Sequence, residues 1–141
     1  MADLYHRYAE VFRDDPEVRE FWARMAREEE SHESSAALVR RVADGQDLPA
    51  EIGVSESELQ EIISQAHAHI AGDPPDLDAA VRFALRLELA ASEYFLTTAL
   101  ANVSPEIAKL VEATSKADAE HARTLVGFAH SRDIDVRLAR D

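Results

Sequence analysis

The sequence predicts an all-α protein in which two helical hairpins are joined by a long crossover. Helix-favouring Ala, Leu, Glu and Arg are abundant, whereas Gly (4) and Pro (5) are few among the 141 residues. Apolar residues recur at steps of three and four, the spacing of one face of an α-helix. Helix-starting Asp-Pro-Glu and Ser-Pro-Glu triplets and helix-ending glycines separate these periodic segments.

The first two helices are predicted over residues 2–13 and 16–43. Asp15 is placed to cap the second helix, and Pro16 occupies its first position, where a missing N–H is tolerated. Gly45 follows the last periodic residues and is expected to end this helix.

Three further helices follow along the chain. Residues 55–72 begin with the Ser-x-x-Glu spacing of a capping box and close on a glycine. Asp76 can cap a fourth helix that reaches about residue 102. The Ser-Pro-Glu triplet at 104–106 starts a fifth helix that runs to about residue 131.

The whole chain is expected to form one domain, because its length suffices for a single core. Its predicted parts are a first hairpin (about 2–44), a crossover carrying the short helix (45–75), a second hairpin (about 76–131) and a tail (132–141). The tail is compatible with either an extra helical turn or a loose end.

An internal repeat relates the two hairpins. Residues of the first half recur in the second half at a constant offset of 89 positions, without gaps. The matched residues are Tyr5 and Tyr94, Pro16 and Pro105, Glu29 and Asp118, and His32 and His121. Such self-similarity indicates two helical hairpins of shared design.

Both long helices of the repeat carry an acid and, three residues later, a histidine within an apolar stripe. These pairs are Glu29 with His32, and Asp118 with His121. Positions i and i+3 share one face of a helix, so each pair is expected to point into the core. A buried carboxylate is unfavourable without compensation, and several together repel one another. A cation removes both penalties, and carboxylate and imidazole ligands suit iron, manganese or zinc.

A third acid is expected at the same level of the bundle. Counting back along the fourth helix, from the turn near residues 102–104, reaches Glu88, which also lies in an apolar stripe. The equivalent position of the first hairpin precedes Met1, and Asp3 is the nearest acid, about one helical turn (about 5.4 Å) away. The predicted metal ligands are Glu29, His32, Glu88, Asp118 and His121, with Asp3 as a weaker candidate.

The other polar and aromatic residues receive simpler interpretations. His67 and His69 lie on different sides of a helix and are expected to face solvent, and His6 and His130 lie near helix ends. The acidic run at 28–30 is expected to form a solvated face. The residues expected in the core are Tyr5, Tyr8, Trp22, Tyr94 and Phe95.

On these residues the chain resembles the ferritin-like superfamily, and within it the rubrerythrin-like di-iron carboxylate proteins. That pattern places a Glu on each of two helices and a Glu-x-x-His on each of two others. "EESH" (Glu29 to His32) matches one Glu-x-x-His, and "DAEH" (Asp118 to His121) matches the second with Asp for Glu. Glu88, in "LELAASEYF", matches a lone glutamate. The resemblance covers most of residues 1–131.

The resemblance implies a ferritin-like four-helix bundle whose long crossover carries an extra short helix. It also implies an iron cofactor, two ions where the site is intact, with manganese or zinc as alternatives. The implied activity is iron oxidation, or reduction of peroxide or dioxygen with electrons from an external donor. Because the first helix is short, a second subunit is expected to cover the end of the bundle in a homodimer. The alternative is a non-catalytic helical scaffold, oligomeric or partner-binding, with a degenerate or single-metal site.

The amino-acid composition excludes or disfavours several other classes of function. The chain has no cysteine, which excludes disulfides and thiolate-held metals within it and fits a cytoplasmic location. A formal net charge of −13 disfavours nucleic-acid binding. The apolar runs are short and interrupted by charges, so no membrane-spanning segment is expected.

Overall fold

The structure, a computed structural model, describes residues 1–43, 56–73, 75–99 and 105–136. The backbone alone is described for residues 33–43 and 92–99, and for several positions within 56–59 and 105–118. The described residues form five helices and no strand, which confirms the all-α prediction. The helices are α1 (Ala2–Val11), α2 (Pro16–Ala43), α3 (Glu56–Ala71), α4 (Leu77–Ala99) and α5 (Pro105–Ser131).

The helices begin within one residue of the predicted positions, because local capping chemistry sets these starts. The Asp15 Oδ1 atom accepts hydrogen bonds from the backbone N–H groups of Glu17 (3.0 Å) and Val18 (3.2 Å), as a helix N-cap does. The Asp76 Oδ1 atom likewise accepts from the Ala79 N–H at 2.8 Å. The predicted ends at Gly45 and near residue 102 lie outside the described residues.

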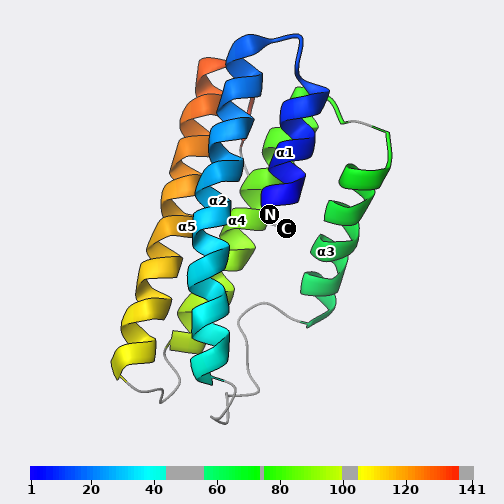
Figure 1. Ribbon diagram of the computed structural model, residues 1–141. Helices are drawn as coiled ribbons and strands as arrows, with labels where there is room; N and C mark the ends of the chain where they lie inside the picture. The colour runs from blue at the N-terminus through cyan, green and yellow to red at the C-terminus, as the bar shows by residue number, and fades with distance from the viewer. Residues whose placement is uncertain (44–55, 74, 100–104, 137–141) are drawn as a thin grey trace.

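The elements form two helical hairpins, α1 with α2 and α4 with α5 (Figure 1). The most extensive packing is between α4 and α5 and between α1 and α2, and α2 also packs on α5. α3 stands beside α1 and makes a smaller contact with it (Figure 1). α1, α2, α4 and α5 therefore surround one core, with α3 at its flank.

The core consists of the apolar stripes that the periodicity predicts. Its largest fully buried apolar side chains are Tyr5, Tyr8, Leu4, Trp22, Met25, Leu125, Val18 and Val81. Phe21 of α2 stacks on Phe128 of α5, with ring centroids 3.8 Å apart. Burial of these large side chains is the main favourable contribution to folding, and it holds the helices that carry the polar residues in register.

The residues that follow α5 show how the tail begins. Asp133 has a positive φ of 56°, the left-handed conformation that commonly closes a helix. The Ile134 N–H donates to the Ala129 carbonyl (2.9 Å), and the Asp133 N–H donates to the His130 carbonyl (3.3 Å). This is the hydrogen-bond pattern of a Schellman motif, and Ile134 is buried against the core. Residues 132–136 therefore neither extend the helix nor hang free.

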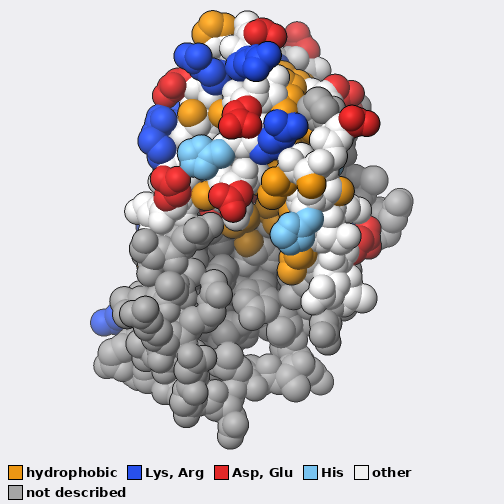
Figure 2. Space-filling view, turned by 45° about the vertical axis from the view of Figure 1, so that its right-hand side comes forward, with side chains coloured by type: hydrophobic (Ala, Val, Ile, Leu, Met, Phe, Trp, Pro, Cys, Tyr) orange, Lys and Arg blue, Asp and Glu red, His pale blue; other side chains and the backbone are white. Residues whose placement is uncertain are grey.

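Charged side chains of both signs are interspersed over the described part of the face in Figure 2. Salt bridges between exposed side chains of the described residues include Arg82 with Asp78 (2.6 Å) and Arg27 with Glu20 (2.9 Å). None of the described helices is both long enough and apolar enough to cross a membrane.

Candidate metal centre

The predicted polar residues meet on the inner faces of three helices. α2 supplies Glu29 and His32, α4 supplies Glu88, and α5 supplies His121. Glu29, Glu88 and His121 are only 2 %, 0 % and 3 % exposed, and His32 is half-buried. The structure thus brings together four of the principal predicted ligands.

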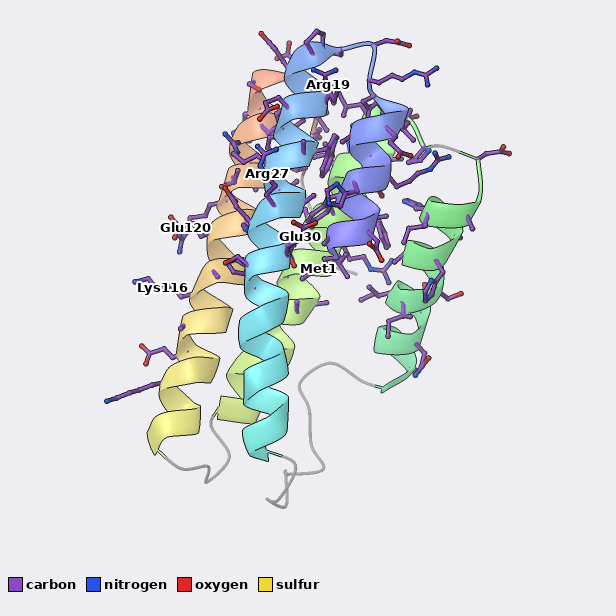
Figure 3. The ribbon with its side chains drawn as sticks, in the orientation of Figure 1. Met1, Arg19, Arg27, Glu30, Lys116 and Glu120 are labelled. Carbon is purple, nitrogen blue, oxygen red and sulfur yellow. The ribbon has the colours of Figure 1, made fainter. Side chains whose placement is uncertain are left out.

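Helix phase explains why these particular side chains point inward. On α5, Lys116 and Glu120 project away from the other helices (Figure 3) and are exposed. Successive residues turn by about 100° around a helix axis, so His121 leaves the outer face that Glu120 occupies. On α2, Glu30 is exposed in the same way beside the buried Glu29.

The ligand atoms lie close together. The His121 Nδ1 atom is 2.8 Å from Glu29 Oε1 and 3.5 Å from Glu88 Oε1, and the His32 Nδ1 atom is 3.8 Å from Glu29 Oε1. The two imidazole rings stack with their centroids 4.9 Å apart. One ligand atom each from Glu29, His32 and His121 lies within 4.8 Å of the others. The spacing allows a single cation to contact all three residues.

Several of these buried atoms have no hydrogen-bond partner among the described residues. They are Glu29 Oε1, His32 Nδ1, Glu88 Oε2 and His121 Nδ1. Although Glu29 Oε1 and His121 Nδ1 are 2.8 Å apart, they are not aligned for a hydrogen bond. Unsatisfied buried polar atoms are unfavourable, and a cation bound among Glu29, His32 and His121 would satisfy their free ligand atoms. The set of two carboxylates and two imidazoles fits iron, manganese or zinc.

The charges of the cluster shift the pKa values of its members. Burial lowers the pKa of His121, but the close negative charges of Glu29 and Glu88 outweigh burial and raise the pKa to about 10. Burial raises the pKa of Glu88, and the negative charge of Glu29 adds to this rise, against the opposing contacts with His121 and Tyr5. Without metal, a proton on His121 therefore provides the positive charge that the carboxylates require.

Tyr5 occupies the side of the site that α1 faces. Its hydroxyl donates a 2.5 Å hydrogen bond to Glu88 Oε1, and its ring is fully buried. Burial raises the pKa of Tyr5 well above its ordinary value, and the negative charge of Glu88 raises it further. Asp3, the weaker ligand candidate on this helix, is exposed. The polar group of α1 that contacts the buried acids is thus a phenol, for which the sequence predicts only a place in the core.

Glu28 is a second residue that the sequence analysis missed. Its Oε2 atom lies 3.2 Å from His121 Nε2, the nitrogen on the other side of the ring from Glu29, and its side chain is 45 % exposed. A metal-ligating histidine commonly donates its other N–H to a carboxylate, which fixes its tautomer and orientation. The Glu28 carboxylate is therefore placed beside the outer nitrogen of His121, where it can orient the ring. In the sequence, Glu28 is one member of an acidic run. The contact with His121 could not be predicted, because the sequence does not show which helix faces that run.

Asp118, the remaining predicted ligand, lies in α5, and its side chain is outside the described residues. It precedes His121 by three residues, so its Cα lies on the same side of the helix.

The other histidines are outside the cluster. His67 and His130 are exposed as predicted, and His6 is an exposed residue 2.8 Å from Glu30 Oε1. The expectation for His69 was wrong: this residue is partly buried, with Nδ1 2.6 Å from the Tyr8 hydroxyl. The crossover helix α3 places His69 against Tyr8 of α1. No local sequence pattern predicts this contact.

Comparison with protein-family models, with curated proteins and with solved structures finds no match to this chain. The function is therefore inferred from the geometry of the cluster and from the residues that form it.

Proposed function

We propose that this protein is a ferritin-like, rubrerythrin-like metal-binding protein with an iron cofactor. One observation carries the proposal: carboxylate and imidazole atoms from α2, α4 and α5 converge in the interior without hydrogen-bond partners among the described residues. The arrangement of α1, α2, α4 and α5 around one core also supports a ferritin-like four-helix bundle.

The described residues have distinct roles in this proposal. Glu29, Glu88, His32 and His121 hold the metal, and Asp118 is the further carboxylate needed for a second ion. The Tyr5 hydroxyl occupies Glu88 Oε1 and leaves Oε2 without a described partner, so this oxygen is available to a cation. Burial excludes water from most of the site.

We propose redox chemistry rather than hydrolysis for this centre. Bound iron would supply one-electron steps between its ferrous and ferric states, for iron oxidation or for reduction of peroxide or dioxygen. Reductive turnover requires an external electron donor, because the chain has no cysteine to hold an iron–sulfur centre of its own. A homodimer remains part of the proposal.

A second candidate is a non-catalytic helical scaffold with a degenerate or single-metal site. The raised pKa of His121 favours it, because a protonated imidazole satisfies the carboxylates of Glu29 and Glu88 without any metal. Bound metal and bound proton compete for the same nitrogen. The two candidates therefore differ in whether metal displaces this proton near neutral pH.

Anaerobic titration with ferrous iron tests the proposal. We predict that the parent protein binds one or two ions per chain and that His121→Ala reduces the affinity at least about tenfold, the effect expected from loss of a ligand. His130→Ala, which removes an exposed histidine of the same helix, is the matched control and should bind like the parent. Circular dichroism checks that His121→Ala remains helical.

Two results would contradict the iron proposal. Failure of the parent to bind iron would leave the scaffold as the function. Equal iron binding by His121→Ala and the parent would show that the metal lies elsewhere.

A further inference from the structure

Three oxidisable aromatic side chains form a continuous series that starts at the metal cluster. The Tyr5 hydroxyl contacts Glu88, and the Tyr5 ring lies 5.5 Å from the Trp22 ring, centroid to centroid. Trp22 lies 4.9 Å from Tyr8, whose hydroxyl is 2.6 Å from His69 Nδ1. All three aromatic residues are fully buried, whereas His69 is partly exposed. The series therefore runs from the buried acids to the solvent side of α1 and α3.

Proton acceptors are present at the tyrosines but not at the tryptophan. A tyrosine that loses an electron becomes a strong acid, so its oxidation requires a hydrogen-bonded base. His69 is such a base for Tyr8, because burial lowers the pKa of its imidazole and keeps the ring neutral. The buried Trp22 Nε1 atom has no hydrogen-bond partner within the described part of the chain.

This difference assigns separate roles to the aromatic residues. Oxidised Trp22 has no described group to receive its proton, so it is a short-lived intermediate that passes the electron vacancy on. At Tyr8 the vacancy is stabilised, because the phenolic proton moves to His69. The neighbouring Phe21 and Phe12 are much harder to oxidise and lie against Trp22 and Tyr8 respectively. They confine electron transfer to the Tyr-Trp-Tyr series.

We propose that Tyr8, Trp22 and Tyr5 form an electron relay that connects the metal cluster with a one-electron donor in solution. This inference rests on the proposed function for its oxidant, which is hydrogen peroxide reduced at the metal centre. The rings touch in sequence, and electron tunnelling falls off exponentially with distance. Transfer in short steps is therefore faster than a single step from the surface.

The electrons and protons balance as follows. One electron leaves Tyr8 and reaches the centre through Trp22 and Tyr5, while the O–H bond of Tyr8 breaks and its proton moves to His69 Nδ1. When Tyr5 gives up its electron, its phenolic proton shifts to Glu88 Oε1, and it returns to Tyr5 as the electron from Trp22 arrives. Tyr8 is then a neutral phenoxyl radical. The external donor returns one electron to Tyr8, and His69 returns the proton. Two such cycles, with two protons from solvent, reduce one hydrogen peroxide molecule to two water molecules.

A laser flash that photoionises tryptophan tests the relay in the metal-free full chain. Trp22 is the single tryptophan, so the starting radical is unambiguous. We predict that the indole radical decays as a tyrosyl radical forms. Tyr5→Phe and Tyr8→Phe should each retain tyrosyl formation, because either neighbour can donate to Trp22. The double variant should lose it, and Tyr94→Phe, the control, should behave like the parent.

The role of His69 is tested in the Tyr5→Phe background, where Tyr8 is the only relay tyrosine left. His69→Leu should slow tyrosyl formation by roughly tenfold or more, equivalent to about 1.4 kcal/mol in the barrier. Tyrosyl formation in the double Tyr5→Phe, Tyr8→Phe variant at the parent rate would overturn the relay. An unchanged rate in His69→Leu would overturn the assignment of the proton acceptor.

Freeze-quench electron paramagnetic resonance of the iron-loaded protein mixed with peroxide connects the relay to the metal. We predict a tyrosyl signal from Tyr8 that Trp22→Phe and Tyr8→Phe each remove, leaving only a signal from Tyr5, without changing the bound iron. An unchanged signal in these variants would overturn the relay and leave the proposed function intact. Absence of bound iron would instead overturn the proposed function, while the flash experiment still tests the relay.

Discussion

At the residue scale, His121 is the side chain on which the cluster depends. Its Nδ1 faces Glu29 and Glu88 in the interior, and its Nε2 faces Glu28 near the surface. A neutral imidazole can bind a metal through only one nitrogen while the other carries a proton. The inner nitrogen is thus the one placed to bind a metal, and the outer nitrogen lies 3.2 Å from the Glu28 carboxylate.

We predict that Glu28→Gln weakens metal binding about tenfold to a hundredfold while the fold persists, because the amide accepts the N–H less strongly than a carboxylate. Isothermal titration with Mn²⁺ measures the change. Glu20→Gln removes the same charge from an exposed position of the same helix and is the control. If both variants bind like the parent, Glu28 does not orient His121. If both weaken equally, the effect is general electrostatic attraction.

At the element scale, local hydrogen bonds define one end of each of two helices that carry the site. Asp76 caps α4, which carries Glu88, and the Schellman motif at Asp133 closes α5, which carries His121. A left-handed residue without hydrogen-bonding help favours glycine, because a Cβ atom is disfavoured there. Asp133 therefore occupies a position where its side chain lowers the stability of the helix end.

We predict that Asp133→Gly is more stable than the parent protein and that Asp133→Ala is less stable than the parent protein. The glycine and alanine variants should differ by roughly 1 kcal/mol in the free energy of unfolding, the penalty of a left-handed alanine. Urea unfolding followed by circular dichroism measures the order. An alanine variant as stable as the glycine variant would show that Asp133 does not adopt the left-handed conformation in solution.

At the scale of the whole molecule, the cluster couples stability to pH and metal. Burial lowers the pKa of His121, but the carboxylates of Glu29 and Glu88 raise it above its ordinary 6.5 to about 10. A raised pKa in the folded state gives stability that is fully present below pH 6.5 and lost as pH rises towards 10. Metal requires the deprotonated nitrogen, so its binding acts in the opposite direction.

We predict that the metal-free chain loses on the order of a few kcal/mol of unfolding free energy between pH 6.5 and about 10. The chain saturated with Mn²⁺ should lack this loss, because the metal replaces the proton. Urea unfolding at steps across the range measures both, and His121→Gln is the control that should flatten the metal-free profile. A parent profile identical to that of His121→Gln would refute the coupling.

Much of the architecture follows from local sequence patterns. The starts of the helices follow from Asp15, Asp76 and the Pro-Glu pairs, because capping involves neighbouring residues only. The burial of Glu29, Glu88 and His121 follows from their phase within apolar stripes and from the repeat. These features were predictable because a helix converts sequence spacing directly into a shared face.

Only the tertiary structure decided which polar groups meet across helices. Tyr5 and Glu88 are separated by 83 positions, and Tyr8 and His69 by 61. Such contacts depend on the rotation and height of each helix against its neighbours, which side-chain packing sets over the whole core. The sequence by itself determined the helices and the inward-facing acids and histidines. Packing determined that a phenol adjoins Glu88 and that Glu28 adjoins His121.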